Sequence, residues 1–135
     1  MGRRYAGVEL GNLIFNKDIA AEAAIKLAPK ATAITRDEAL KISTDFAARV
    51  RERVDPEALV FVFGSTVRGT ADLNSDIDVA VVSKTHDADV IEAAVALSRI
   101  ARDVSWDIEV HTVAYEDWRK GDPHVSEIQK WGIAI

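Results

Sequence analysis

Apolar residues recur at helical spacing in the segment that follows Thr35. Thr35 and Glu38 can form a capping box, in which each side chain accepts a hydrogen bond from the other residue's backbone N–H group. The apolar positions that come next lie three or four residues apart: Ala39, Ile42, Phe46 and Val50. This spacing predicts an amphipathic helix over residues 36–54. Asp55 and Pro56 follow. The residue before a proline avoids the helical conformation, so we expect the helix to end before Asp55.

Two apolar, β-prone segments then predict neighbouring strands. Residues 59–63 (LVFVF) are wholly apolar, which is typical of a buried strand. Residues 76–83 (DIDVAVVS) begin with alternating polar and apolar side chains. In an extended chain this alternation puts Ile77, Val79 and Val81 on one face of the strand, and Asp76 and Asp78 on the other.

Helical spacing returns after the second strand, in the apolar positions Val90, Ala94, Leu97 and Ala101. They predict a helix over about residues 88–103 that crosses back over the sheet to a third strand at about 107–113. Two short helical segments, 115–120 and 124–131, are expected on either side of Gly121-Asp122-Pro123. The order of elements predicts a fold of the α/β (α+β) class.

The N-terminal part of the chain lies outside this pattern. An alanine-rich stretch at residues 19–27 favours helix, whereas the residues before it are ambiguous. A length of 135 residues suits one domain with its own core. We therefore interpret residues 34–135 as that domain and residues 1–33 as an N-terminal extension of unclear role.

Composition and charge narrow the function classes. Cysteine is absent, which excludes disulfides and thiolate metal sites, and no apolar run is long enough to span a bilayer. We expect a cytoplasmic protein without membrane association. The formal net charge of −5 argues against binding of extended nucleic acid through a basic face. The histidines form no close pair, so the sequence favours a hard, oxygen-liganded metal over zinc.

The most informative motif combines a Gly-Ser turn with an Asp-x-Asp pair. Gly64 and Ser65 end the first strand, and after ten intervening residues Asp76 and Asp78 open the second. Carboxylates at positions i and i+2 of a strand point the same way, and their repulsion is relieved when a divalent cation lies between them. Gly64 lets the backbone approach a ligand closely, while Ser65 can present its hydroxyl and a helix start to a terminal phosphate.

A third carboxylate on the next strand would complete a two-metal arrangement for phosphoryl transfer. Asp107, Glu109 and His111 alternate along that strand and face one side. Only the carboxylates suit Mg²⁺. For His111 a role near the acceptor is one alternative, and a structural histidine is the interpretation that we prefer.

These motifs resemble the DNA polymerase β-like nucleotidyltransferase superfamily, specifically its minimal, stand-alone branch (MNT). The resemblance covers the chain from about residue 35 to its end. The matching segments are residues 62–71 (VFGSTVRGTA), 74–81 (NSDIDVAV), 108–113 (IEVHTV) and 127–133 (EIQKWGI). The first motif is the most specific, because it combines residue identity, spacing and strand context.

The resemblance implies a nucleotidyltransferase fold, a mixed β-sheet flanked by helices. It implies ATP or another NTP as donor, and Mg²⁺ held by Asp76, Asp78 and a third acid. Counting along the chain places Glu109 at this third position, although Asp107 offers the residue type that is usual in the family. Gly64 and Ser65 would contact phosphates. For Arg68, phosphate binding and an ordinary surface salt bridge remain alternatives.

Three functions follow as hypotheses. The first is a Mg²⁺-dependent enzyme that moves NMP, in particular AMP from ATP, to a hydroxyl on a partner protein, because so short a chain leaves little room for an acceptor domain. The resemblance suggests a HEPN-type partner and a toxin–antitoxin pair. The second is a catalytically silent module that inhibits a partner by contact. The third is a small-molecule adenylyltransferase of the antibiotic-modifying type.

Overall fold

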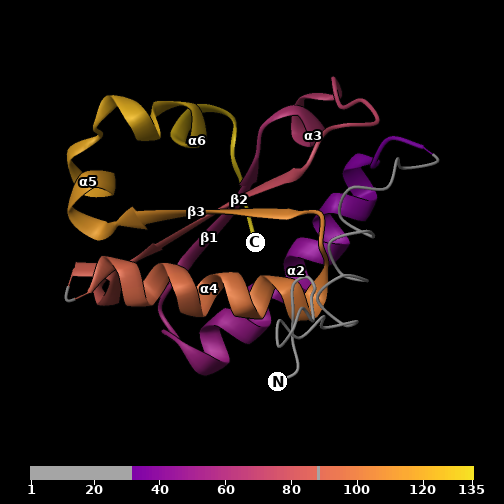
Figure 1. Cartoon of the computed structure of the whole chain (residues 1–135). Helices are drawn as coiled ribbons and strands as arrows, with labels where there is room; N and C mark the ends of the chain where they lie inside the picture. Colours follow the sequence, from indigo (N-terminus) through magenta and orange to yellow (C-terminus); the bar gives the residue numbers. More distant parts are fainter. Residues whose placement is uncertain (1–31, 88) are drawn as a thin grey trace, which may run out of the picture. The chain divides into compact units, whose positions relative to one another are not determined.

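A computed structural model describes residues 32–87 and 89–135 of the chain (Figure 1). The strands are β1 (Leu59–Phe63), β2 (Ile77–Ser83), β3 (Ile108–Ala114) and β4 (Ile133–Ala134). The α-helices are α2 (Arg36–Arg53), α3 (Ser65–Arg68), α4 (Val90–Val104), α5 (Tyr115–Lys120) and α6 (Ser126–Trp131). Two 3₁₀ turns are η1 (Lys84–Asp87) and η2 (Pro123–Val125). The interpretation of residues 1–33 as an extension, with a helix at 19–27, falls almost wholly outside the described residues.

The strands form one mixed sheet in the order β3-β2-β1-β4. β1 runs antiparallel to both of its neighbours, whereas β2 and β3 are parallel. The end of β1 therefore lies beside the beginning of β2, and β3 begins at the same edge of the sheet. This arrangement confirms the predicted α/β class with a mixed sheet flanked by helices.

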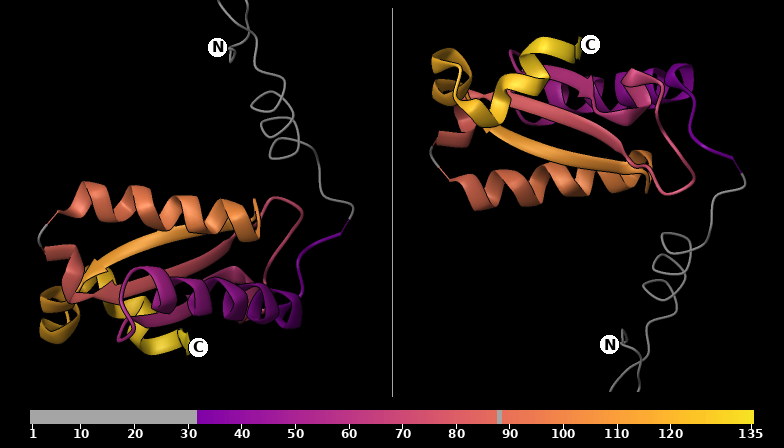
Figure 2. Two further views of the ribbon diagram at one scale, coloured as in Figure 1. Left: turned by 90° about the horizontal axis from the view of Figure 1, so that it is seen from below. Right: turned by 90° about the horizontal axis from the view of Figure 1, so that it is seen from above.

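Helices cover both faces of the sheet, and alternate residues of each strand contribute to two separate clusters. Val60, Val62 and Val79 pack with residues of α2 and α4, such as Phe46 and Leu97. The side chains of opposite parity pack toward α5 and α6: Phe61, Phe63, Ala80, Val82 and Val113. In the view from below (left in Figure 2), α4 runs alongside β3 and α2 passes in front of the strands.

Local capping sets the ends of the two long helices. The predicted capping box of α2 is present: the Glu38 N–H donates to the Thr35 hydroxyl at 3.1 Å, and the Thr35 N–H donates to the Glu38 carboxylate at 2.9 Å. α4 begins at Val90, two residues later than predicted. The reason is Asp89, whose carboxylate accepts a hydrogen bond from the Glu92 N–H at 2.9 Å and so acts as N-cap.

The strands differ from the prediction by small amounts. β2 and β3 each begin one residue later than expected, at Ile77 and Ile108. The short strand β4 was not predicted, because two residues are too few to produce an alternating pattern. β4 pairs with β1, and the Ile135 N–H donates to the Val60 carbonyl at 2.9 Å. Within the described part of the chain, every helix is too short or too polar to cross a membrane.

Candidate active site

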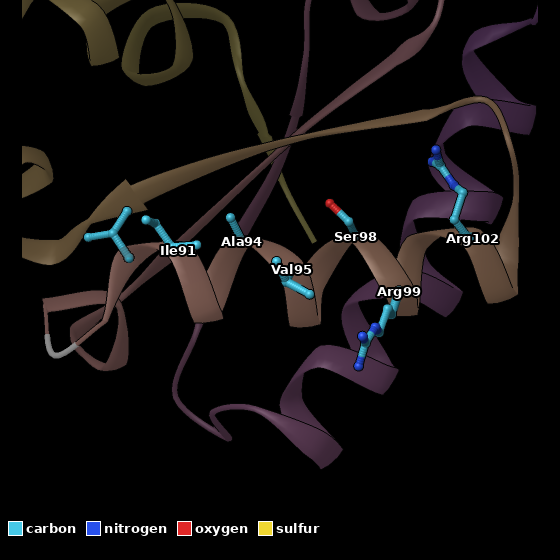
Figure 3. Close-up of a pocket in the computed structure, with 7 residues that line it drawn as sticks. Ile91, Ala94, Val95, Ser98, Arg99 and Arg102 are labelled. Carbon is cyan, nitrogen blue, oxygen red and sulfur yellow. The ribbon is translucent and has the colours of Figure 1, made fainter.

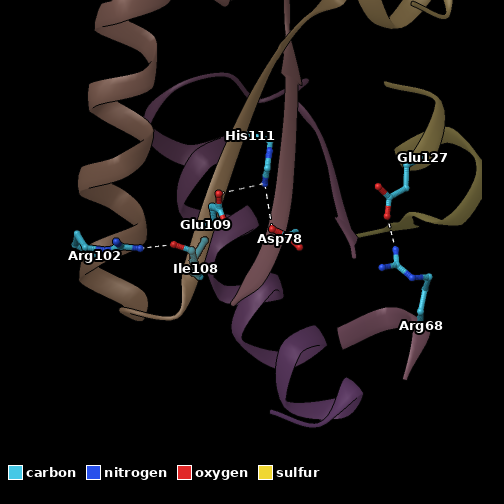
Figure 4. A network of polar contacts seen from close by, with 7 residues as sticks. All are labelled: Arg68, Asp78, Arg102, Ile108, Glu109, His111 and Glu127. Carbon is cyan, nitrogen blue, oxygen red and sulfur yellow. Dashed lines mark hydrogen bonds and ion pairs between the residues drawn. The ribbon is translucent and has the colours of Figure 1, made fainter. Parts of the chain in front are cut away.

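Acidic side chains of β2 and β3 meet near the beginnings of these parallel strands. Asp78 of β2 and Glu109 of β3 are register partners. His111 lies two residues after Glu109 on the same face of β3. Its Nε2 atom lies 3.1 Å from Asp78 Oδ1 and 4.0 Å from Glu109 Oε2. Figure 4 shows the three side chains pointing toward one another.

This cluster has the composition and spacing of a cation site. One ligand atom from each of Asp78, Glu109 and His111 lies within 4.8 Å of the others. Asp78 and His111 are half-buried and Glu109 is exposed, so the cluster is accessible from solvent. Carboxylate oxygens suit Mg²⁺, whereas an imidazole nitrogen is a softer ligand. The chemistry of the two acids therefore fits Mg²⁺, with His111 as a neighbour that orients Asp78.

Gly64 brings the end of β1 against the same carboxylate. Phe63 pairs with Asp78 in the antiparallel ladder, and Gly64 follows with a φ of 83°. A Cβ atom at Gly64 would lie 2.2 Å from Asp78 Oδ2 and 3.1 Å from its Cγ. Both the positive φ and this contact require glycine. The residue that was predicted to allow close approach of a ligand thus also makes room for Asp78.

Ser65 is the first residue of the short helix α3, with Gly64 at the N-cap position. The N–H groups of Val67 and Arg68 donate to the Gly64 carbonyl at 3.2 and 3.1 Å. The turn from β1 into α3 therefore holds Ser65 next to the residue that contacts Asp78. This is the arrangement expected for the Gly-Ser motif, a strand that leads directly into a helix start beside the acids.

The other predicted acids lie just outside the strands. Asp76 directly precedes β2, and Asp107 directly precedes β3. The Asp107 carbonyl accepts a hydrogen bond from the Ile77 N–H at 2.7 Å. Among the described residues, the cluster that includes Asp78 contains neither Asp76 nor Asp107. Of the two candidates for the third acid, Glu109 is the one that lies beside Asp78.

Arg68 forms an ion pair with Glu127 of α6 (Figure 4). Both side chains are exposed, at 40% and 48%. This contact is the surface salt bridge that the sequence offered as one alternative, and it links α3 to α6. Because an exposed pair of this kind contributes little to stability, Arg68 can exchange Glu127 for another anion at small cost.

His111 has more contacts at the site than its interpretation as a structural histidine implied. Its ring packs edge-on against Phe63, with ring centroids 5.0 Å apart. The hydrogen bond to Asp78 raises the pKa of His111 above the usual value, and the charges of Asp78, Glu109 and Glu127 act in the same direction, while burial opposes them. The alternation of Glu109 and His111 along one strand face was the sequence signal for this position.

A pocket of about 400 Å³ opens beside His111. Its walls come from β1, β3, η2 and α6, and they combine apolar and polar side chains: Phe63, His111, Thr112, Val113, His124, Glu127 and Ile128. The pocket thus begins at the histidine that contacts Asp78. It offers space for a ring or a single side chain next to the acidic cluster.

Comparison with known proteins gives the class of protein to which this site belongs. Residues 44–134, more than half of the chain, match the nucleotidyltransferase domain family. No curated protein and no solved structure matches the chain. The matched range includes the Gly-Ser turn, both strands of the acidic cluster and α6. The chain belongs to the nucleotidyltransferase domain family.

Proposed function

We propose that this protein is a Mg²⁺-dependent nucleotidyltransferase that moves AMP from ATP to a hydroxyl group. The catalytic and metal-binding residues in this proposal are Asp76, Asp78 and Glu109. The observation that supports it most is the register of the parallel strands, in which Asp78 and Glu109 are direct partners beside Gly64. Family membership supports nucleotide transfer as the reaction class.

The donor set favours a hard cation that is shared with phosphates. Mg²⁺, when bound, would neutralise the carboxylates and the phosphates of the donor and polarise the phosphorus centre. Asp78 accepts a hydrogen bond from His111, which fixes the orientation of its carboxylate. Gly64 and Ser65 contact the terminal phosphates through backbone N–H groups and the Ser65 hydroxyl, and Arg68 adds a cation at the edge of the site.

The reaction forms one bond and breaks one. The acceptor oxygen attacks the α-phosphorus of ATP, and the bond from this phosphorus to the oxygen that bridges to the β-phosphate breaks. Pyrophosphate leaves with the bonding electrons. Glu109, whose side chain is 57% exposed, accepts the proton of the hydroxyl group and so raises the nucleophilicity of the oxygen.

The acceptor in this proposal is a side-chain hydroxyl of a partner protein of the HEPN type. The pocket beside His111 supports a single side chain, since Phe63 and Ile128 supply apolar walls and His124 a polar one. A tyrosine suits such walls. The net charge of −5 disfavours a polynucleotide as acceptor. A role in a toxin–antitoxin pair and a cytoplasmic location belong to the same proposal.

The test is labelling in a lysate of the host cell. The protein is incubated with Mg²⁺ and α-labelled ATP, and labelled species are identified by mass spectrometry. We expect one dominant labelled protein with an added adenylyl mass, and no labelling with Asp78→Asn. Equal labelling by the parent and Asp78→Asn contradicts the enzyme assignment, and a labelled small molecule contradicts the protein acceptor.

A further inference from the structure

Helix α4 carries exposed apolar side chains on the face that is turned away from the hydrophobic core. Leu97, Ile100 and Ala101 are buried against the sheet. On the outer side, Val90 is 57% exposed, Ile91 78% and Val95 45%. Apolar side chains with this degree of exposure, grouped on one helix, are typical of an interaction surface.

The same face bounds a shallow pocket of about 450 Å³. Figure 3 shows the labelled residues of its lining along the length of α4. The lining consists of Val90, Ile91, Ala94, Val95, Ser98, Arg99 and Arg102. All of these residues belong to α4, so the pocket is the open surface of one helix that lacks a neighbour on this side within the described part of the chain.

The spacing on this face is that of a helix-pairing seam. Ile91, Val95 and Ser98 follow one another at intervals of four and three residues. Glu92 and Arg99 each lie one residue after a seam position, so they line the same edge of the seam. Both are exposed. Within the described residues, neither belongs to an ion pair of the helix's own chain.

We propose that α4 pairs with α4 of a second copy of this chain in an antiparallel arrangement. Glu92 and Arg99 are placed symmetrically about the midpoint between Val95 and Ala96. A two-fold axis through this midpoint brings Glu92 of each copy opposite Arg99 of the other, so that two equivalent pairs form. A two-fold interface requires this kind of self-complementarity.

The charges on α4 favour a second copy of the chain as the partner, and they favour an antiparallel orientation of the two helices. A parallel, in-register pair would put the Glu92 and Arg99 side chains of the two copies on opposite edges of the seam, so that neither would meet an opposite charge. The antiparallel pair instead buries the exposed Ile91 and Val95 between opposite charges. α4 has 15 residues and is about 22 Å long, so the contact is at the small end of specific interfaces and the dimer is weak.

The proposed dimer leaves the candidate active site open. α4 belongs to the layer that covers one face of the sheet, while Asp78 and His111 lie on the other face, with α5 and α6. The dimer proposal therefore does not depend on the proposed reaction. An active enzyme that stays monomeric would contradict only the dimer, and an inactive protein that dimerises would contradict only the reaction.

Sedimentation of the full chain over concentrations from about 10 to about 500 µM tests the proposal. We expect a monomer–dimer equilibrium in the parent. Glu92→Arg and Arg99→Glu should each raise the dimer dissociation constant about tenfold, because each puts two like-charge pairs across the axis. The double variant E92R/R99E should restore the parental value, since the two opposite-charge pairs form again with exchanged signs.

Glu52→Arg is the matched control, because Glu52 is also exposed and lies on α2, and its reversal changes the net charge equally. It should leave the equilibrium unchanged. Residues seven apart on one helix are too distant to interact within a chain, so restoration reports a contact between copies. A parent that stays monomeric, or a double variant that remains as weak as the single ones, overturns the proposal.

Cross-linking provides an independent readout, since the chain has no cysteine. Val95→Cys places a thiol close to the proposed axis, and mild oxidation should convert most of the protein to a disulfide-linked dimer. Lys120→Cys, an exposed position on α5, is the control and should not cross-link efficiently. Equal cross-linking at both positions means random collision and contradicts the antiparallel arrangement.

Discussion

Asp78 of β2 and Glu109 of β3 are register partners across the parallel part of the sheet. This relationship brings two carboxylates together from positions 31 residues apart in the sequence. The close fit of Gly64 against Asp78 adds the end of β1 to the same place. The site is therefore built by the pairing of three strands.

The first prediction concerns the paired acids of the Asp-x-Asp motif. Asp76→Asn combined with Asp78→Asn should abolish Mg²⁺-dependent ATP binding, because the cation loses its charged ligands. The fold should stay intact, because the substitutions leave the buried core unchanged, although the variant loses the contribution that the His111–Asp78 pair makes at low pH. Isothermal titration calorimetry with and without Mg²⁺ measures the binding.

The control for the Asp76/Asp78 double variant removes two negative charges at positions away from the site. Asp45→Asn combined with Asp103→Asn changes two exposed acids of α2 and α4, each in a surface ion pair of small energetic value. ATP affinity should stay at the parental level. If the Asp76/Asp78 variant retains metal-dependent affinity, the assignment of these residues to the metal is wrong.

The third acid is tested by comparing Glu109 with Asp107. Glu109→Gln should lower the rate of transfer by about two orders of magnitude or more and leave ATP binding nearly intact, because this group acts on the acceptor oxygen. Asp107→Asn, just before β3, should have a much smaller effect. Single-turnover rates with bound ATP separate the two steps, and the reverse ranking would assign the role to Asp107.

Much of the fold could be predicted because the determining signals are local. The capping box of Thr35 and Glu38 and the apolar run 59–63 give α2 and β1 nearly at their observed bounds. The N-cap of α4 at Asp89 is also a local signal, and it starts the helix two residues later than the apolar spacing alone predicts. Alternation on β2 correctly gave the face on which Asp78 lies.

The geometry of the site depends on pairing between distant segments. Alternation puts Glu109 and His111 on one face of β3, yet it does not give the strand neighbour or the register. The hydrogen bond from His111 to Asp78 follows from that register, which explains why a histidine considered alone was interpreted as structural. The ion pair of Arg68 with Glu127 likewise depends on the packing of α6.

The raised pKa of His111 gives a pH prediction. The folded-state pKa lies above the ordinary value of 6.5, chiefly because the protonated ring donates to Asp78. The pair therefore contributes stability that is fully present below the unfolded pKa and is lost as the pH rises through the folded pKa. Asp78→Asn should lower the His111 pKa toward 6.5, as followed by NMR of the ring protons.

Stability measurements provide the second half of this test. The difference in unfolding free energy between the parent and Asp78→Asn should shift in favour of the parent as the pH falls below the His111 pKa. An unchanged His111 pKa in Asp78→Asn would mean that another group controls the titration.

The last prediction separates the two functions of Gly64, and Gly69 is its matched control. Both have a positive φ, 83° and 77°, but a Cβ at Gly64 meets Asp78 Oδ2 at 2.2 Å, whereas a Cβ at Gly69 meets nothing within 4 Å. Gly69→Ala should cost about 1 kcal/mol from backbone strain alone. Gly64→Ala should cost roughly 2–4 kcal/mol and weaken ATP binding, since Asp78 must move. Urea denaturation and calorimetry measure both effects, and equal losses in the two variants would show that the Asp78 contact does not constrain residue 64.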